Sequence, residues 1–235
     1  MKNIIRIFLG KLNIAVTLCL AVLLAGGLGG TTYVLASATS NFTQTINAGT
    51  LAADIVDGSY VTVASPSFAM TAATFSFSCQ TKTGTFGEAT QQIYVSNPDA
   101  ADSGWNLALA GSSTSAVWDS AGVDFDFNDP TSSGCTDGAD VGDTVGGQMT
   151  VDPSVGTLSK GACASCDTTG VTLGASPSSF SEGVTDSINI ISATSGSNDI
   201  GDWKATGISI SQKIPAEQPA ASDYDINLVL TATAL

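Results

Sequence analysis

Acidic side chains at alternating positions are the first residues of this sequence that could do chemistry. Asp124, Asp126, Asn128 and Asp129 stand in the order D-x-D-x-N-D, which is how one common calcium-binding loop begins. That loop needs glycine at its sixth position and a bidentate glutamate at its twelfth, whereas this chain has Asp129 and Cys135 there. An EF-hand is therefore excluded. A Ca²⁺ site of another kind could still take Asp124, Asp126 and Asp129 as ligands.

A buried strand is the alternative interpretation of the same residues. In the run VDFDF, residues 123–127, an extended backbone would turn Phe125 and Phe127 inward and the aspartates outward. The stretch that follows, residues 128–147, is acidic and rich in glycine, and its carboxylates could add oxygen ligands. We therefore expect either no cofactor or Ca²⁺ at these aspartates.

Catalytic groups are hard to assemble from this composition. The chain has no histidine, and its single arginine, Arg6, lies in the N-terminal segment. Its many serines therefore lack the usual general base, and no G-x-S-x-G sequence is present. A pair of carboxylates could hydrolyse a glycoside, but the spacing of the 21 acidic residues singles out no pair. We expect a protein that is not an enzyme.

Cysteines are the next residues that could form cross-links or bind a metal ion. Cys79, Cys135, Cys163 and Cys166 follow the apolar N-terminal segment, and four cysteines in an exported chain predict two disulfides with three pairings open. The C-x-x-C formed by Cys163 and Cys166 lacks the histidines of a typical zinc site and the Trp and Pro neighbours of a redox motif. A bridge from the loop of Cys135 to the loop at 158–179 would reduce the closure entropy of both loops.

The N-terminus has the layout of a secretory signal. Basic residues come first, residues 12–30 are almost wholly apolar, and Ala36-Ser37-Ala38 fits a cleavage site after Ala38. Residues 1–38 are therefore expected to be a signal peptide. The alternative is an uncleaved anchor, since residues 12–36 are long enough to span a bilayer.

Net charge narrows the range of partners. Residues 39–235 hold all 21 acidic residues and four of the seven basic ones, which gives 4 − 21 = −17. Such a surface repels nucleic acid and anionic membranes, and it suits a protein that is soluble outside the cell. We expect a secreted protein of the cell surface whose contact with a membrane is confined to the N-terminal segment.

The sequence predicts that short β-strands position these residues. Alternating apolar and polar runs are separated by clusters of Gly, Ser and Asp, and no amphipathic helical period follows the signal. This spacing predicts an all-β fold, a single Ig-like or jelly-roll-like β-sandwich over residues 39–235. The runs are residues 59–65, 74–81, 91–97, 105–111, 123–127, 147–152, 187–193, 207–214 and 224–235.

Two of the tryptophans carry a resemblance to a known family. Residues 95–111, which contain Trp105-Asn106-Leu107, resemble the first motif of the WxL domain, and residues 201–235 resemble its C-terminal layout. The likeness covers about residues 88–235, although Trp203-Lys204-Ala205 lacks the leucine of the second motif. It implies a bacterial surface protein held non-covalently to peptidoglycan or to a surface protein. Trp105, Leu107 and Trp203 are then the candidates for wall binding.

The same tryptophans also fit a core. Trp105 shares one face of its strand with Leu107 and Leu109, so the alternative interpretation is that the ring is buried.

A fainter resemblance concerns residues 38–57, which are similar to the start of camelysin/TasA-type fibre subunits. It implies self-assembly, in which this segment adds a strand to the sheet of a neighbour. The alternative is an ordinary first strand of the same domain.

Overall fold

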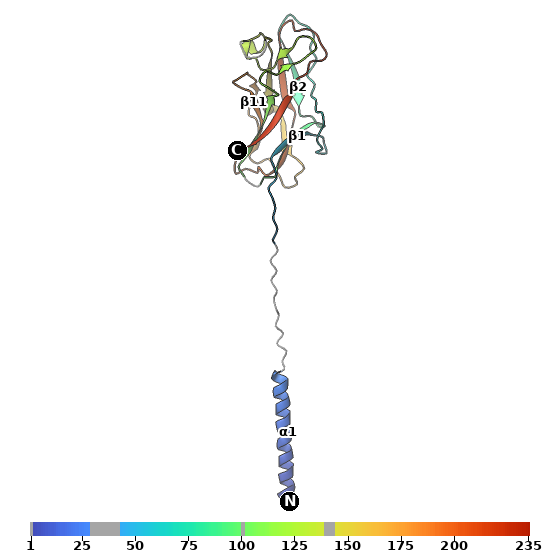
Figure 1. The fold of residues 1–235 in the computed structure, drawn as a ribbon, viewed down its shortest axis with the longest axis vertical. Helices are drawn as coiled ribbons and strands as arrows, with labels where there is room; N and C mark the ends of the chain where they lie inside the picture. The colour runs from blue at the N-terminus through green and yellow to red at the C-terminus, as the bar shows by residue number, and fades with distance from the viewer. Residues whose placement is uncertain (1, 29–42, 100–101, 139–143) are drawn as a thin grey trace. The chain divides into compact units, whose positions relative to one another are not determined.

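The computed structural model describes residues 2–28, 43–99, 102–138 and 144–235. The chain forms two compact units, residues 1–46 and 47–235. Helix α1, Lys2–Leu28, belongs to the first unit (Figure 1). It is built mainly from Leu, Ile and Ala. None of the helices in the described part of the chain has the length and apolarity needed to cross a membrane. The expected cleavage point after Ala38 lies outside the described residues.

Residues 47–235 form an all-β sandwich, as the spacing of the runs predicts (Figure 1). The described strands and 3₁₀ turns, in chain order, are β1 Ala52–Val56, β2 Gln80–Phe86, β3 Gln92–Asn97, β4 Trp105–Gly111, β5 Val117–Trp118, β6 Phe125–Asp126, η1 Thr131–Ser133, β7 Gln148–Asp152, η2 Pro153–Val155, β8 Thr157–Lys160, β9 Val171–Leu173, β10 Ser178–Ser179, β11 Ser187–Ala193, β12 Gly201–Thr206, β13 Ile208–Ile214 and β14 Leu228–Ala234.

One layer of the sandwich consists of two antiparallel sheets that continue into each other. Their strand orders are β1-β3-β12-β8 and β10-β7-β13-β2. Only Gly207 separates β12 from β13, and its φ of 76° is a conformation that favours glycine. On one side, β12 pairs with β3 and β13 pairs with β2, and β2 and β3 are consecutive strands of the chain. On the other side, β12 pairs with β8 and β13 pairs with β7, which are also consecutive strands. The layer is therefore one long sheet that changes direction at Gly207.

The other layer is an antiparallel sheet in the order β14-β4-β11-β9. Its central strand β4 alternates as the sequence predicts, with Trp105, Leu107 and Leu109 buried. These side chains pack against residues from the first layer, among them Ile93, and the two layers share one hydrophobic core. A short hairpin of β5 and β6 completes the described strands.

Two of the expected strands are absent or shifted, and two others are shorter than predicted, since 224–235 becomes a strand only from Leu228 and 123–127 only at residues 125–126. Residues 59–65 make only a single bridge at Thr62, and the run 74–81 becomes a strand only from Gln80 onward. Phe75 and Phe77 are exposed in an irregular segment instead of sharing a buried face. The alternation was present in both runs, but the described part of the chain provides no partner strand alongside residues 74–79.

Candidate functional site

The expected wall-binding residues lie in the core. Trp105, Leu107 and Trp203 each have 0% of their surface exposed, and the two indole rings are 5.3 Å apart between centroids. Each indole N–H is already satisfied inside the protein, Trp105 Nε1 by the carbonyl of Asp199 at 3.1 Å and Trp203 Nε1 by the carbonyl of Asp167 at 2.7 Å. Because a sugar ring cannot reach these side chains in the folded chain, the structure supports the core interpretation.

The candidate calcium ligands do not converge. Within the described residues, Asp124, Asp126 and Asp129 do not belong to any group of three ligand atoms that could hold one ion. Asp126 is buried together with Phe125 and Phe127, so the expected outward direction of this aspartate is wrong. Its Oδ1 accepts the N–H of Phe127 at 2.6 Å, which keeps the carboxylate against the backbone. Ca²⁺ at these residues stays a prediction.

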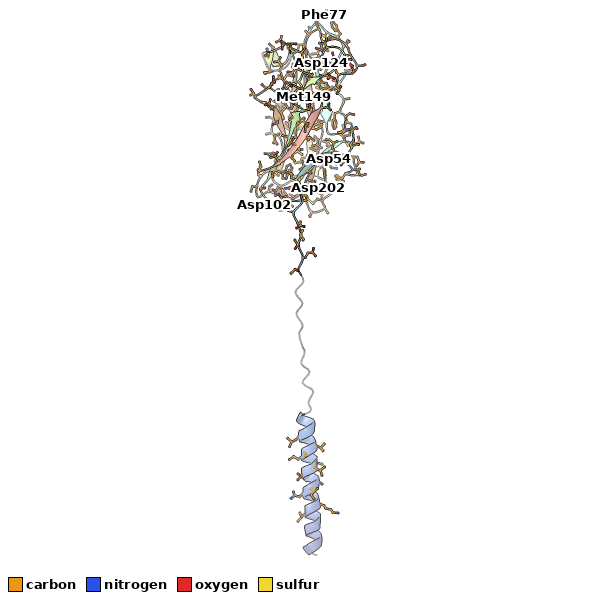
Figure 2. The ribbon with its side chains drawn as sticks, in the orientation of Figure 1. Asp54, Phe77, Asp102, Asp124, Met149 and Asp202 are labelled. Carbon is orange, nitrogen blue, oxygen red and sulfur yellow. A yellow bond between two sulfur atoms is a disulfide. The ribbon has the colours of Figure 1, made fainter. Side chains whose placement is uncertain are left out.

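All four cysteines expected in disulfides form them, and the structure decides which of the three open pairings is present. Cys79 is bonded to Cys135, and Cys163 is bonded to Cys166. The bridge between the two long loops does not exist. Phe77, two residues before Cys79, lies near one end of the sandwich, whereas Asp202, which accepts the N–H of Cys163, lies near the other end (Figure 2).

A buried carboxylate holds the loop of the short disulfide. Asp202, on β12, accepts the backbone N–H of Ala162 at 2.9 Å and that of Cys163 at 2.8 Å, and it also accepts the hydroxyl of Tyr94. Gly201 allows the close approach of Cys166, because a Cβ at this position would collide with Cys166 Sγ. The pairing of β8 with β12 brings these groups together, since it places residue 160 opposite residue 203.

The Tyr94 hydroxyl should make stability sensitive to alkaline pH. Burial, together with its hydrogen bond to Asp202, raises the pKa of Tyr94 far above its usual value of 10.0. This contribution to stability is complete below about pH 10 and is lost as the pH rises toward the folded-state pKa, because the unfolded chain releases the proton first. Denaturant unfolding across this range should show the decline. Tyr94→Phe should remove the part of this fall in unfolding free energy that comes from the Tyr94 hydroxyl. A fall of the same size in Tyr94→Phe would show that another group causes it.

A groove lies near the Phe77 and Asp124 end of the sandwich (Figure 2). It has a volume of about 520 Å³. It is formed by the irregular segment 68–75, the neighbouring strands β2 and β13, the β5–β6 hairpin and the loop 218–224. We call it the Trp118 groove. Its lining residues are Phe68, Ala69, Met70, Thr71, Ala72, Ala73, Thr74, Phe75, Gln80, Lys82, Trp118, Phe125, Gln212, Ile214, Gln218, Pro219, Ala220, Ala221, Ser222 and Tyr224.

Three aromatic rings form one wall of the groove. Trp118 and Phe125 are directly opposite in the β5–β6 hairpin, and they stack with an interplanar angle of 10°. Phe125 meets the ring of Tyr224 edge-on. Trp118 Nε1 donates to Gln212 Oε1 at 3.0 Å, and the amide of Gln212 is itself fixed by the carbonyl of Asp126. The indole therefore has a defined orientation while remaining only half-buried.

The other walls are fixed by cross-links and hydrogen bonds. The carbonyl of Val123, in the hairpin, is within hydrogen-bond distance of the Tyr224 hydroxyl and accepts from Gln218 Nε2, which holds the 218–224 loop against the hairpin. The Cys79–Cys135 disulfide ties down the end of the irregular segment that carries Phe75. These constraints preorganise the groove.

The charge of the groove differs from that of the whole chain. None of the lining residues is acidic, although the sequence has 21 acidic residues. Lys82 contributes a cation to the lining. The groove is therefore apolar and aromatic, with amide side chains and one positive charge. Trp118 lies outside the motifs that resemble the WxL domain, so no sequence pattern pointed to it.

The comparisons with known proteins add no relative. No protein-family model matches the chain, and neither a curated protein nor a solved structure matches it. The resemblances to the WxL domain and to camelysin/TasA-type subunits remain predictions.

Proposed function

We propose that this chain is an exported, non-catalytic protein of the bacterial cell surface that attaches non-covalently to peptidoglycan through the Trp118 groove. The observation that carries the proposal is the composition of the groove, which joins an oriented indole to amide side chains and a lysine. The groove replaces Trp105 and Trp203 as the expected site of wall contact, because both of those side chains are buried.

Peptidoglycan has the chemistry that such a groove recognises. The apolar faces of its sugar rings can pack on Trp118. Its hydroxyl and amide N–H groups can donate to the side-chain oxygens of Gln80 and Gln218, whose Nε2 groups donate to carbonyls of the protein itself. The carboxylates of its peptide stems would be attracted to Lys82, whose neighbours in the lining are uncharged. Hydrolysis by a carboxylate pair is not expected in this groove, since no aspartate or glutamate lines it.

Sedimentation with isolated wall sacculi tests this proposal. The full chain should pellet with sacculi and stay in solution without them. Trp118→Ala should reduce wall affinity roughly tenfold or more, because it removes the main stacking surface. Tyr60→Ala is a matched control, since this aromatic residue packs against Tyr94 and does not line the groove. Binding that both variants retain in full would refute the groove as the wall site.

Fibre assembly is the second candidate function, and an exposed apolar residue favours it. Residues 43–51 form no regular structure, and Ile46 has 89% of its surface exposed. Residues 52–56 are already paired as β1 with β3, so only the preceding segment could be donated to a neighbour. Pelleting without sacculi that disappears when residues 43–50 are deleted would favour fibre assembly over wall binding.

A further inference from the structure

Three side chains that could bind a metal ion converge on the short disulfide. The sulfur atoms of Cys163 and Cys166 and a carboxylate oxygen of Asp202 all lie within 4.8 Å of one another. A tetrahedral Zn²⁺ site needs sulfur atoms about 3.8 Å apart and sulfur-to-oxygen separations of about 3.5 Å. The sulfur atoms are now bonded to each other, so opening this bond is the rearrangement that such a site requires.

Hydrogen bonds hold the Asp202 carboxylate in position without a metal ion. Asp202 is buried, and its Oδ2 accepts hydrogen bonds from Tyr94 and from the N–H of Ala162. Its Oδ1 accepts only the N–H of Cys163 in the described structure, which leaves room for a further bond. Hydrogen bonds of this kind orient the ligands of metal sites and raise their affinity. Cys163 is half-buried, so a fourth coordination position can face water.

Electrostatics favours a cation once the disulfide is reduced. Two thiolates next to the Asp202 carboxylate would repel each other, and this repulsion disfavours a metal-free dithiolate. A divalent ion removes the repulsion and accepts all three donors, and C-x-x-C spacing is common among zinc ligands. The nearby Lys160 ammonium donates to the carbonyl of Ala164 at 2.9 Å, and it forms no ion pair with Asp202 within the described residues.

We propose that Cys163, Cys166 and Asp202 form a redox-gated site for a thiophilic divalent cation such as Zn²⁺. A dithiol reductant supplies two electrons and two protons to the Cys163–Cys166 bond and becomes a disulfide itself. The protein then carries two thiols, and both thiol protons leave when the cation binds. In the oxidised protein the two sulfur atoms are bonded to each other, and the cation does not bind.

Cadmium titration of the full chain tests the site, because sulfur-to-cadmium charge transfer absorbs in the ultraviolet. After reduction and removal of the reductant, the chain should bind one Cd²⁺ at this site, and the oxidised chain should show no such band. Cys163→Ser/Cys166→Ser is the matched control. It keeps Cys79, Cys135 and Cys19, so it reports any binding by the other thiols. Zn²⁺ should displace Cd²⁺ from the reduced wild-type chain.

The role of Asp202 is tested by affinity. Asp202→Asn should weaken Cd²⁺ binding at least tenfold, and Tyr94→Phe should weaken it about tenfold while leaving all three ligands in place. Near-ultraviolet circular dichroism of each oxidised variant establishes that it is folded. Tyr94→Phe and cadmium NMR of the wild-type protein remain informative if Asp202→Asn does not fold. Equal binding by the cysteine control, or a cadmium shift typical of sulfur ligands alone, would overturn the proposal.

Discussion

Trp105→Ala is expected to lower the free energy of unfolding by about 3–5 kcal/mol. The ring is fully buried between the two layers, and it contacts Trp203 at a centroid distance of 5.3 Å. Its removal deletes apolar contacts, leaves a cavity and loses the hydrogen bond to the carbonyl of Asp199. That carbonyl keeps a second donor, Asn97 Nδ2 at 2.7 Å, so it is not left unpaired. Most of the loss should therefore come from packing.

Two further variants separate these contributions. Trp105→Phe keeps an aromatic ring but no N–H group, so its loss should be clearly smaller than that of Trp105→Ala. Trp118→Ala should cost less stability than Trp105→Ala, because Trp118 is only half-buried. Denaturant unfolding of the three variants measures the differences. A loss below about 1 kcal/mol for Trp105→Ala would be inconsistent with a ring at the centre of the core.

Removal of the long disulfide is the second change for which we expect a large effect. Cys79 and Cys135 are 56 residues apart, and the chain-entropy description gives a stabilisation of about 4 kcal/mol for a loop of this length. Cys163 and Cys166 are three residues apart, for which the same relation gives about 2 kcal/mol. Cys79→Ser/Cys135→Ser should therefore lower the unfolding free energy roughly twice as much as Cys163→Ser/Cys166→Ser.

The two disulfide variants should also differ in wall binding. Cys79–Cys135 fixes the end of a groove wall, so its loss should weaken the binding of sacculi. The short disulfide includes Cys163, which contacts Asp202, and Asp202 lies near the other end of the sandwich (Figure 2). Unfolding and sedimentation on the same preparations test both effects. A larger stability loss for the short ring would show that native contacts, and not chain entropy, dominate.

Some of the fold could be predicted because strand alternation is a local property. The run 187–193 was predicted with the bounds that β11 has, and the run 105–111 with those of β4. Both strands are central in their sheet, so the side of each strand that is apolar is also the side that is buried. The same pattern failed at 74–79, where alternation is present without a neighbouring strand.

The sequence by itself determined the all-β class, the inward faces of the central strands, the presence of disulfides and the lack of histidine chemistry. Only the tertiary structure decided which cysteines pair, which tryptophan stays accessible, and which carboxylate meets the C-x-x-C loop. Asp202 is 39 residues from Cys163, and Gln212 is 94 residues from Trp118. These contacts depend on which distant strands pair and on where one layer of the sandwich ends over the other. The alternation of apolar and polar residues along a strand encodes neither of these.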